Sequence, residues 1–147
     1  MTFLLDVNVV IALIDPGHVH NRQAVQWFTR HAARSWATSP ITQNAVLRIV
    51  GNPSYPSFPG SLYLVQTLMQ RLLMFPGHEF WPDDISLLDS NVMEDDGLLT
   101  SRQITDSYLL ALAHAHHGQL ATFDSRLVTH GIRGGKEALH LIPASVE

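Results

Sequence analysis

The sequence ITDSYLLALAHAHHGQLATFD, residues 104–124, carries the clearest structural pattern in the chain. Its first part has the pattern of a helix, and Ser101 or Thr105 is expected to cap the start of that helix. Gly118 is expected to end the helix, and residues 119–123 are a short apolar run typical of a buried strand. The stretch therefore predicts a helix, a stop and a strand in succession.

Two acids bracket this unit, Asp106 near the start of the helix and Asp124 just after the strand. The helix from Asp106 to His117 is about 17 Å long, at roughly 1.5 Å per residue. The strand from Gln119 to Asp124 covers about 17 Å, at roughly 3.3 Å per residue. The helix and the strand run in opposite directions and have about the same length. Both acids are therefore expected at the same edge of the sheet, the edge formed by the carboxyl ends of the strands. That edge binds the ligand in open α/β sheets.

Strands and helices alternate along the rest of the chain, which predicts an α/β fold with a parallel sheet covered by helices on both faces. Pro143 follows the last strand, so that strand is expected at a sheet edge. Ser39 and Pro40 have the pattern of a helix cap and a first helical residue. The expected strands are residues 2–5, 36–38, 78–81, 119–123 and 139–142, and the expected helices are residues 7–14, 18–34, 40–50, 62–75 and 104–117.

The composition is that of one globular domain spanning residues 1–147, since 46% of the residues are apolar. No apolar run approaches the roughly 20 residues that span a bilayer, so no membrane contact is expected. The opening MTFLLDVNVV lacks the basic start of a signal peptide, and the cytoplasm is the expected compartment. Cysteine is absent, which excludes disulfides and thiolate chemistry.

The net charge of −4 gives no support for a nucleic-acid substrate, which usually calls for a basic face. The charge does not exclude such a substrate either, because the acids are uneven and a bound divalent metal supplies positive charge locally. Seven acids fall in one stretch that contains no Lys or Arg: Glu79, Asp83, Asp84, Asp89, Glu94, Asp95 and Asp96.

A third acid, Asp6, follows the strand at residues 2–5 and should reach the same edge as Asp106 and Asp124. Three carboxylates in one pocket repel one another, and their pKa values rise unless a cation joins them. Oxygen ligands without Cys select a hard ion such as Mg²⁺ or Mn²⁺. Such an ion keeps bound water, which is then available to attack a phosphodiester.

Each acid also has a simpler structural interpretation. Asp6 is placed to cap the following helix, Asp106 to interact with the helix dipole, and Asp124 to cap a turn at Ser125. The convergence of all three at one edge favours a site. Asn8 is placed to bond Asp6 or a metal-bound water, with a helix-surface amide as the alternative. Arg48 and Arg102 are within possible reach of a phosphate, with simple surface exposure as the alternative.

At LLDVNVVIAL, WATSPITQNAVLRIV and ITDSYLLALAHAHHGQLATFD, the chain resembles PIN-domain proteins, and more narrowly the VapC toxins of toxin–antitoxin pairs. The resemblance covers nearly the whole chain. It implies a PIN-like three-layer α/β/α sandwich with a short, mainly parallel central sheet. It also implies an endoribonuclease that depends on Mg²⁺ or Mn²⁺, an RNA substrate, a cognate antitoxin and a homodimer.

By motif, the resemblance maps the family's acids onto Asp6, Asp106 and Asp124, which are expected to hold the metal directly or through water. Asn8 is expected to support the site by orienting water. The family's remaining acid, usually Glu, falls in PITQN, where this chain has Gln43. A glutamine carries no charge and cannot act as a base. Gln43 is therefore expected to orient water in the catalytic site. Its lack of charge argues against two tightly held metals, and the three remaining acids suffice for one hydrated ion, so the number of metals stays open.

Three other functions stay open at this stage. A phosphotransferase of the haloacid-dehalogenase type would use Asp6 as nucleophile, but such sites require a second acid two positions later, where this chain has Asn8. A receiver domain requires paired acids after the first strand and a lysine after a late strand. The acid pair is missing here, and Lys136 is the only lysine. The third is a PIN-like binding module that has lost activity, and Gln43 is the only residue that points to it.

Overall fold

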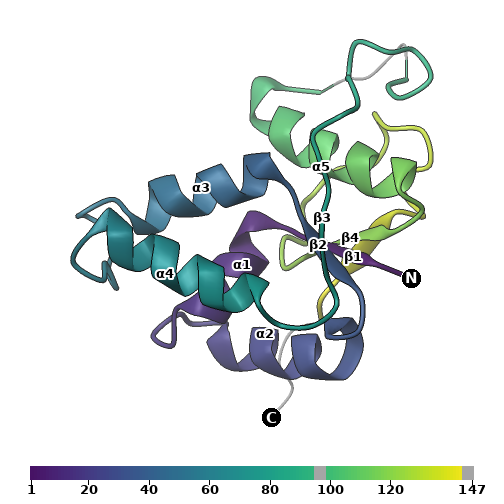
Figure 1. Cartoon of the computed structure of the whole chain (residues 1–147). Helices are drawn as coiled ribbons and strands as arrows, with labels where there is room; N and C mark the ends of the chain where they lie inside the picture. Colours follow the sequence, from purple (N-terminus) through teal and green to yellow (C-terminus); the bar gives the residue numbers. More distant parts are fainter. Residues whose placement is uncertain (95–98, 144–147) are drawn as a thin grey trace.

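The structure, a computed structural model, describes residues 1–94 and 99–143 and has a parallel central sheet (Figure 1). In space the five strands follow the order β3-β2-β1-β4-β5, and every neighbouring pair is parallel. The last strand lies at a sheet edge, as predicted. The strands are β1 (Phe3–Leu5), β2 (Trp36–Thr38), β3 (His78–Phe80), β4 (Gln119–Thr122) and β5 (Leu139–Leu141).

Helices cover both faces of this sheet, so the predicted α/β/α sandwich is confirmed. One apolar core lies between the sheet and helices α1 to α4, and a second lies between the sheet and α5. In Figure 1, α3 and α4 lie side by side as a pair away from α5. The helices are α1 (Val7–Ile14), α2 (Asn21–Trp27), α3 (Pro40–Val50), α4 (Leu62–Leu73) and α5 (Ile104–Ala115).

The two cores follow from the alternation of side chains along each strand. In β1, Leu5 packs in the core with α1 to α4, whereas Leu4 packs in the core with α5. In β4, Ala121 and Leu120 divide between the two cores in the same way. These positions are fully buried, which is why both strands appear in the sequence as continuous apolar runs.

The direction in which the chain adds strands to the sheet reverses between β1 and β4. From β1 the chain moves outward through β2 to β3, and later from β4 outward to β5. Ligands of open α/β sheets bind outside the carboxyl ends of the strands at such a reversal. Asp6 follows β1 and Asp124 lies two residues after β4, so these two acids stand on either side of it.

The predicted single helix over residues 18–34 is wrong. Helix α2 starts only at Asn21, and at Phe28–Ala32 it becomes a π-helical turn, in which Ala33 N–H donates to the carbonyl of Phe28 at 2.9 Å. Two adjacent aromatic residues are buried at this change of helix type. Trp27 packs against Phe3, and Phe28 packs against Trp36. Both side chains therefore contact strands of the sheet at the point where the helix type changes.

Both predicted ends of α5 need correction. The start is capped neither by Ser101 nor by Thr105: Thr100 and Gln103 form a capping box around a 3₁₀ turn at Ser101–Gln103, which leads into α5. At the other end His117, not Gly118, takes the left-handed conformation, with φ 59°. Gly118 is needed for a different reason, because a Cβ there would lie 2.4 Å from the carbonyl oxygen of Thr2.

The cap of α3 also differs from the prediction. Ser39 is the N-cap residue and Pro40 begins the helix, but the Ser39 side chain makes no capping bond. Asp83, from the chain after β3, accepts the N–H of Ile41 at 3.1 Å instead. An acid of the acidic stretch thus anchors α3 from outside. In the part of the chain that the structure describes, no helix is long and apolar enough to span a membrane.

Candidate active site

Asp6 lies at the junction of β1 and α1 and is almost completely buried, with 5% of its surface exposed. One carboxylate oxygen, Oδ1, accepts the N–H of Val7 at 2.8 Å, which caps α1. The other, Oδ2, accepts the hydroxyl of Thr122 at 2.7 Å. Burial raises the pKa of Asp6 above its usual value, against the lowering effect of these two bonds.

Thr122 is a site residue that sequence reasoning missed. It is the last residue of β4 and is fully buried. Its hydroxyl donates to Asp6 and accepts from the side-chain amide of Asn8 at 3.2 Å and from the N–H of Asp124 at 3.1 Å. One hydroxyl therefore fixes the ends of β1 and β4 relative to each other. A polar residue two positions before Asp124 in a buried strand was the available signal.

Asp106 and Asp124 line one cavity of about 450 Å³ at the carboxyl end of the sheet. Both side chains are half-buried. The predicted convergence of these two acids is confirmed by this shared cavity. The remaining wall comes from the turn before α5 and the chain after β4: Thr100, Arg102, Gln103, Arg126, Leu127 and Val128.

The three acids lie close enough to affect one another's protonation. Burial raises the pKa of Asp106 to about 6, and the negative charges of Asp6 and Asp124 add to the effect. The charge of Asp124 also contributes to the raised pKa of Asp6. No basic side chain in the described residues forms an ion pair with any of the three. The site therefore holds like charges that a cation would stabilise.

The simpler structural roles of these acids are present as well. Asp6 caps α1, and Asp106 lies in the first turn of α5. Asp124 Oδ1 accepts the N–H of Arg126 at 2.9 Å, which closes the turn after β4. The structural and functional interpretations are therefore compatible, because the same ends of strands and helices that need caps lie at the ligand edge.

Asn8 and Gln43 are placed differently from the acids. Asn8 bonds Thr122, and its Oδ1 accepts the N–H of Phe123 at 3.4 Å, so it reaches Asp6 only through Thr122. Gln43 donates to the hydroxyl of Thr38 at 3.0 Å and lines a separate groove between α3 and α4. Asn8 therefore supports the site indirectly, and Gln43 does not line the cavity of Asp106 and Asp124.

The donor set suits a hard divalent ion that keeps most of its water. Within residues 1–94 and 99–143, no three side chains of the His, Cys, Asp and Glu types lie close enough together to enclose a metal. Mg²⁺ usually takes only one or two carboxylates directly and retains waters. Asp106 and Asp124, with Asp6 behind them, fit that mode of binding. Their carboxylates supply oxygen ligands, and no ion pair balances their negative charge among the described residues.

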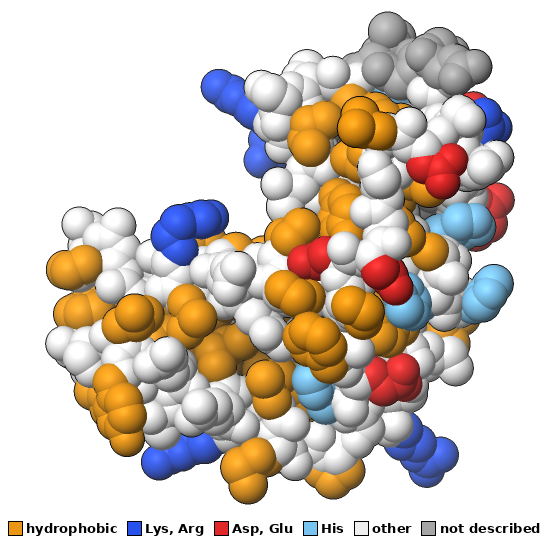
Figure 2. Space-filling model, turned by 45° about the horizontal axis from the view of Figure 1, so that its top comes forward, with side chains coloured by type: hydrophobic (Ala, Val, Ile, Leu, Met, Phe, Trp, Pro, Cys, Tyr) orange, Lys and Arg blue, Asp and Glu red, His pale blue; other side chains and the backbone are white. Residues whose placement is uncertain are grey.

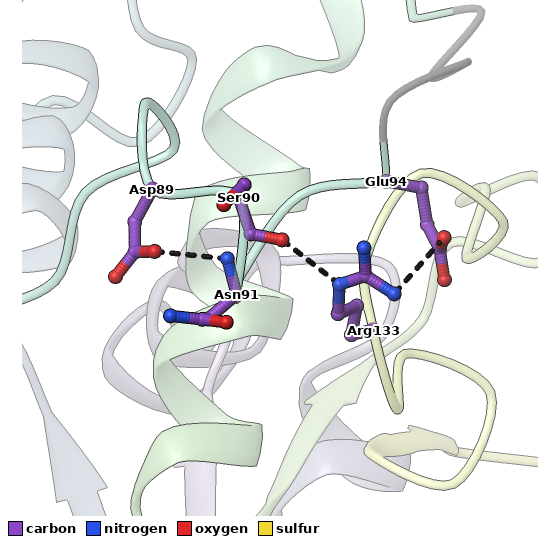
Figure 3. Close-up of polar contacts among 5 residues, drawn as sticks. All are labelled: Asp89, Ser90, Asn91, Glu94 and Arg133. Carbon is purple, nitrogen blue, oxygen red and sulfur yellow. Dashed lines mark hydrogen bonds and ion pairs between the residues drawn. The ribbon is translucent and has the colours of Figure 1, made fainter.

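The loop after β3 and the loop before β5 are joined by polar contacts (Figure 3). Arg133 Nε donates to the carbonyl of Ser90 at 2.9 Å, and its guanidinium lies 3.4 Å from the carboxylate of Glu94. Asp89 accepts the N–H of Asn91 at 2.8 Å in the same loop. Because both members of the ion pair are partly exposed, the contact positions the loops more than it stabilises the fold.

The acids of the stretch after β3 serve local structure where the structure describes them. Asp84, for example, lies 3.8 Å from the imidazole of His116. Asp95 and Asp96 lie outside the described residues.

Figure 2 shows the surface hollowed between the α3–α4 pair and the part of the molecule that contains α5, with Lys or Arg side chains on both sides.

Comparison with known proteins assigns the family. The chain matches the PIN domain over residues 3–131. Ribonuclease VapC44 of Mycobacterium tuberculosis (strain ATCC 25618 / H37Rv) is 42% identical over 134 residues, covering 91% of this chain and 94% of that protein. Ribonuclease VapC39 of the same strain is 39% identical over 139 residues, covering 95% of this chain and 100% of that protein.

A solved structure has the same fold. The crystal structure of VapBC2 from Rickettsia felis, bound to a DNA fragment from their promoter, matches with a TM-score of 0.55. The match covers 84% of this chain and 89% of that chain, at 15% sequence identity. The resemblance stated from the sequence is confirmed: the chain belongs to the PIN-domain family and, within it, to the VapC type.

Proposed function

We propose that the chain is the ribonuclease toxin of a toxin–antitoxin pair and that it cleaves RNA phosphodiester bonds with the help of Mg²⁺ or Mn²⁺. The observation that carries the proposal is the shared cavity of Asp106 and Asp124, beside the buried Asp6, at the reversal of the sheet. The VapC ribonucleases named above support the activity. Membership of this family favours a ribonuclease over a phosphotransferase or a receiver domain.

Asp106 and Asp124 would hold the ion from the cavity, and Asp6 would add its charge from behind. A bound divalent ion supplies a water of lowered pKa and neutralises the charge that grows on the phosphate oxygens. Each acid keeps its position because its backbone or its partners are fixed. Thr122 and the N–H of Val7 hold both oxygens of Asp6, and the Asp124 carboxylate is turned toward the chain at Arg126.

Gln43 and Asn8 would orient water rather than bind metal directly. The side chain of Asn8 is hydrogen-bonded to Thr122. The side chain of Gln43, in the first turn of α3, is hydrogen-bonded to Thr38 at the end of β2. Because Gln43 is uncharged and lies outside the acid cavity, the proposal includes one hydrated ion. A protein antitoxin and a homodimer are further parts of the proposal, and the VapBC2 assembly from Rickettsia felis supports the antitoxin.

The test is cleavage of mixed cellular RNA by the purified chain, without a partner, in Mg²⁺ or Mn²⁺ and then in EDTA. Discrete fragments that require both the metal and Asp106 are expected. Asp106→Asn should reduce the rate by at least about 100-fold, in the range seen when a group that stabilises transition-state charge is removed. Asp89→Asn is the matched control, because Asp89 is exposed and only closes its own turn.

Equal cleavage by wild type and Asp106→Asn would show that the acids are not the catalytic site. Absence of cleavage in every metal, together with weak metal binding, would favour a PIN-like binding module. That outcome would also show that Gln43 in place of the family's Glu has a larger effect than the proposal allows.

A further inference from the structure

Two arginines line the same cavity as the acids. Arg102 comes from the turn before α5, and Arg126 comes from the chain after β4. We propose that Arg102 and Arg126 bind a phosphate of the RNA strand next to the phosphate that is cut. The inference rests on the proposed ribonuclease function and deepens it, because it assigns residues that hold the substrate.

The backbone at both arginines is held in place. Arg126 N–H donates to Asp124 Oδ1 at 2.9 Å, so the arginine follows the acid at a fixed offset. Arg102 lies inside the capping box, in which the N–H of Thr100 donates to Gln103 Oε1 at 2.9 Å. Arg102 lies in the 3₁₀ turn that leads directly into α5, four residues before Asp106. Each arginine is thus tied to one of the two acids.

The guanidinium groups have no competing acid among the residues that the structure describes. Both side chains are exposed, and the ion pairs found there involve Arg133 and His116 instead. A guanidinium presents a planar fork of donors that matches the oxygens of a phosphate. Leu127 and Val128 form an apolar part of the cavity wall.

The charge balance of the cavity gives the arginines a function. With a net charge of −4 and three neighbouring acids, the chain would repel an RNA strand at the point where cleavage must occur. The positive charges of the two arginines equal the negative charges of the two acids that line the cavity. One bound divalent ion therefore makes the net charge of the cavity lining positive. Arg48, the other arginine that the sequence brought forward, is not among the residues that line the cavity.

The test measures RNA binding apart from cleavage. A short, fluorescently labelled single-stranded RNA of mixed sequence is titrated in EDTA with the full chain carrying Asp106→Asn, so that neither metal nor cleavage contributes. In this background Arg102→Gln and Arg126→Gln should each weaken binding by roughly 3- to 5-fold at low salt. Each should also lower the slope of log affinity against log salt by about 0.7, the loss of one phosphate contact.

Arg34→Gln is the matched control, because Arg34 is exposed and lies before β2, at the opposite edge of the sheet. It should leave affinity and slope unchanged. Arg126→Lys should keep the salt slope, since a lysine still presents a point charge to phosphate, whereas a merely structural role for Arg126 predicts no such rescue. In the chain with Asp106, Arg126→Gln should raise KM and leave kcat nearly unchanged.

Unchanged affinity and slope in both glutamine variants would overturn the inference, and so would a lack of RNA binding by the Asp106→Asn chain. If the wild type does not cleave RNA but the slope falls as expected, the phosphate site stands and the proposed catalytic function fails. The two failures are therefore distinguishable.

Discussion

Single residues at this site combine a structural and a chemical role. The carboxylate of Asp6 caps α1 with one oxygen and binds Thr122 with the other, yet it remains a buried charge near two further acids. Asp124 closes its own turn and also lines the cavity. Substitutions at these positions must therefore be judged on stability and on activity separately.

Asp106 should destabilise the fold at neutral pH in the absence of metal. Its pKa is raised to about 6 by burial and by Asp6 and Asp124, so keeping it ionised at pH 7 costs free energy. Asp106→Asn removes this cost and should raise the free energy of unfolding by about 1 kcal/mol, discounted because the side chain is only half-buried. Urea unfolding in EDTA measures the difference, and a lower stability of the variant would contradict the predicted repulsion.

Thr122 should act as a positioning residue for Asp6. Thr122→Val keeps the shape of the side chain but leaves Asp6, Asn8 and the N–H of Asp124 without their shared partner. We expect about 1–3 kcal/mol lower stability and roughly 10- to 100-fold weaker metal-dependent cleavage. Thr122→Ser keeps the hydroxyl and should recover most of the activity. An active valine variant would show that the hydroxyl does not hold the site together.

At the level of whole elements, side-chain contacts at helix ends decide how α1 and α5 meet the loops around them. Asp15, the C-cap residue of α1, accepts the hydroxyl of Tyr55 from the loop between α3 and α4 at 2.6 Å. Burial raises the pKa of Asp15, but the bonds from Tyr55 and the N–H of Gly17 outweigh it, and the net shift is downward. The loop is thereby bound to α1.

Tyr55→Phe should destabilise the fold by about 1.5 kcal/mol at pH 7, the value of a hydrogen bond to a charged group. Because the pKa of Asp15 is lower in the folded chain, this contribution is complete above the unfolded value near 3.9 and is lost as pH falls through the folded value. Denaturation from pH 7 to pH 3 should show the difference shrinking below about pH 4. Tyr63→Phe, at an exposed tyrosine, is the control, and an equal effect there would contradict the assignment.

The end of α5 gives a second prediction at this scale. His117 has φ 59°, a conformation that costs a non-glycine residue about 1–2 kcal/mol, so His117→Gly should stabilise the fold by about 1 kcal/mol. Gly118→Ala should instead be destabilising, because its Cβ would meet the carbonyl oxygen of Thr2 at 2.4 Å. Thermal melts of both variants measure the contrast. Equal melting temperatures would mean that this turn adapts freely.

At the scale of the whole molecule, the sequence predicted the alternating strands and helices and the shared edge of Asp106 and Asp124. Matching lengths of helix and strand suffice for that inference. The spatial order of the strands could not be read in this way, because it depends on pairing between distant segments. The same holds for Thr122, whose role arises from Asp6, 116 positions earlier.

Local packing explains the remaining differences. The π-helical turn after α2 lies where Trp27 and Phe28 both contact strands of the sheet, and the sequence period does not show which residues they contact. Gln43 was expected to orient water in the catalytic site. Its bond to Thr38 and its place in the α3–α4 groove depend on how two helices pack.

The most direct test of a metal site at these acids is the binding of Mn²⁺ to the purified chain, followed through the paramagnetic signal of the free ion. We expect one ion per chain, with an affinity that falls at least about 10-fold in Asp106→Asn, the lower range for disturbed metal sites. Asp89→Asn should bind Mn²⁺ as the wild type does. Equal Mn²⁺ affinity in the wild type and Asp106→Asn, or no binding by the wild type, would contradict a metal site at these acids.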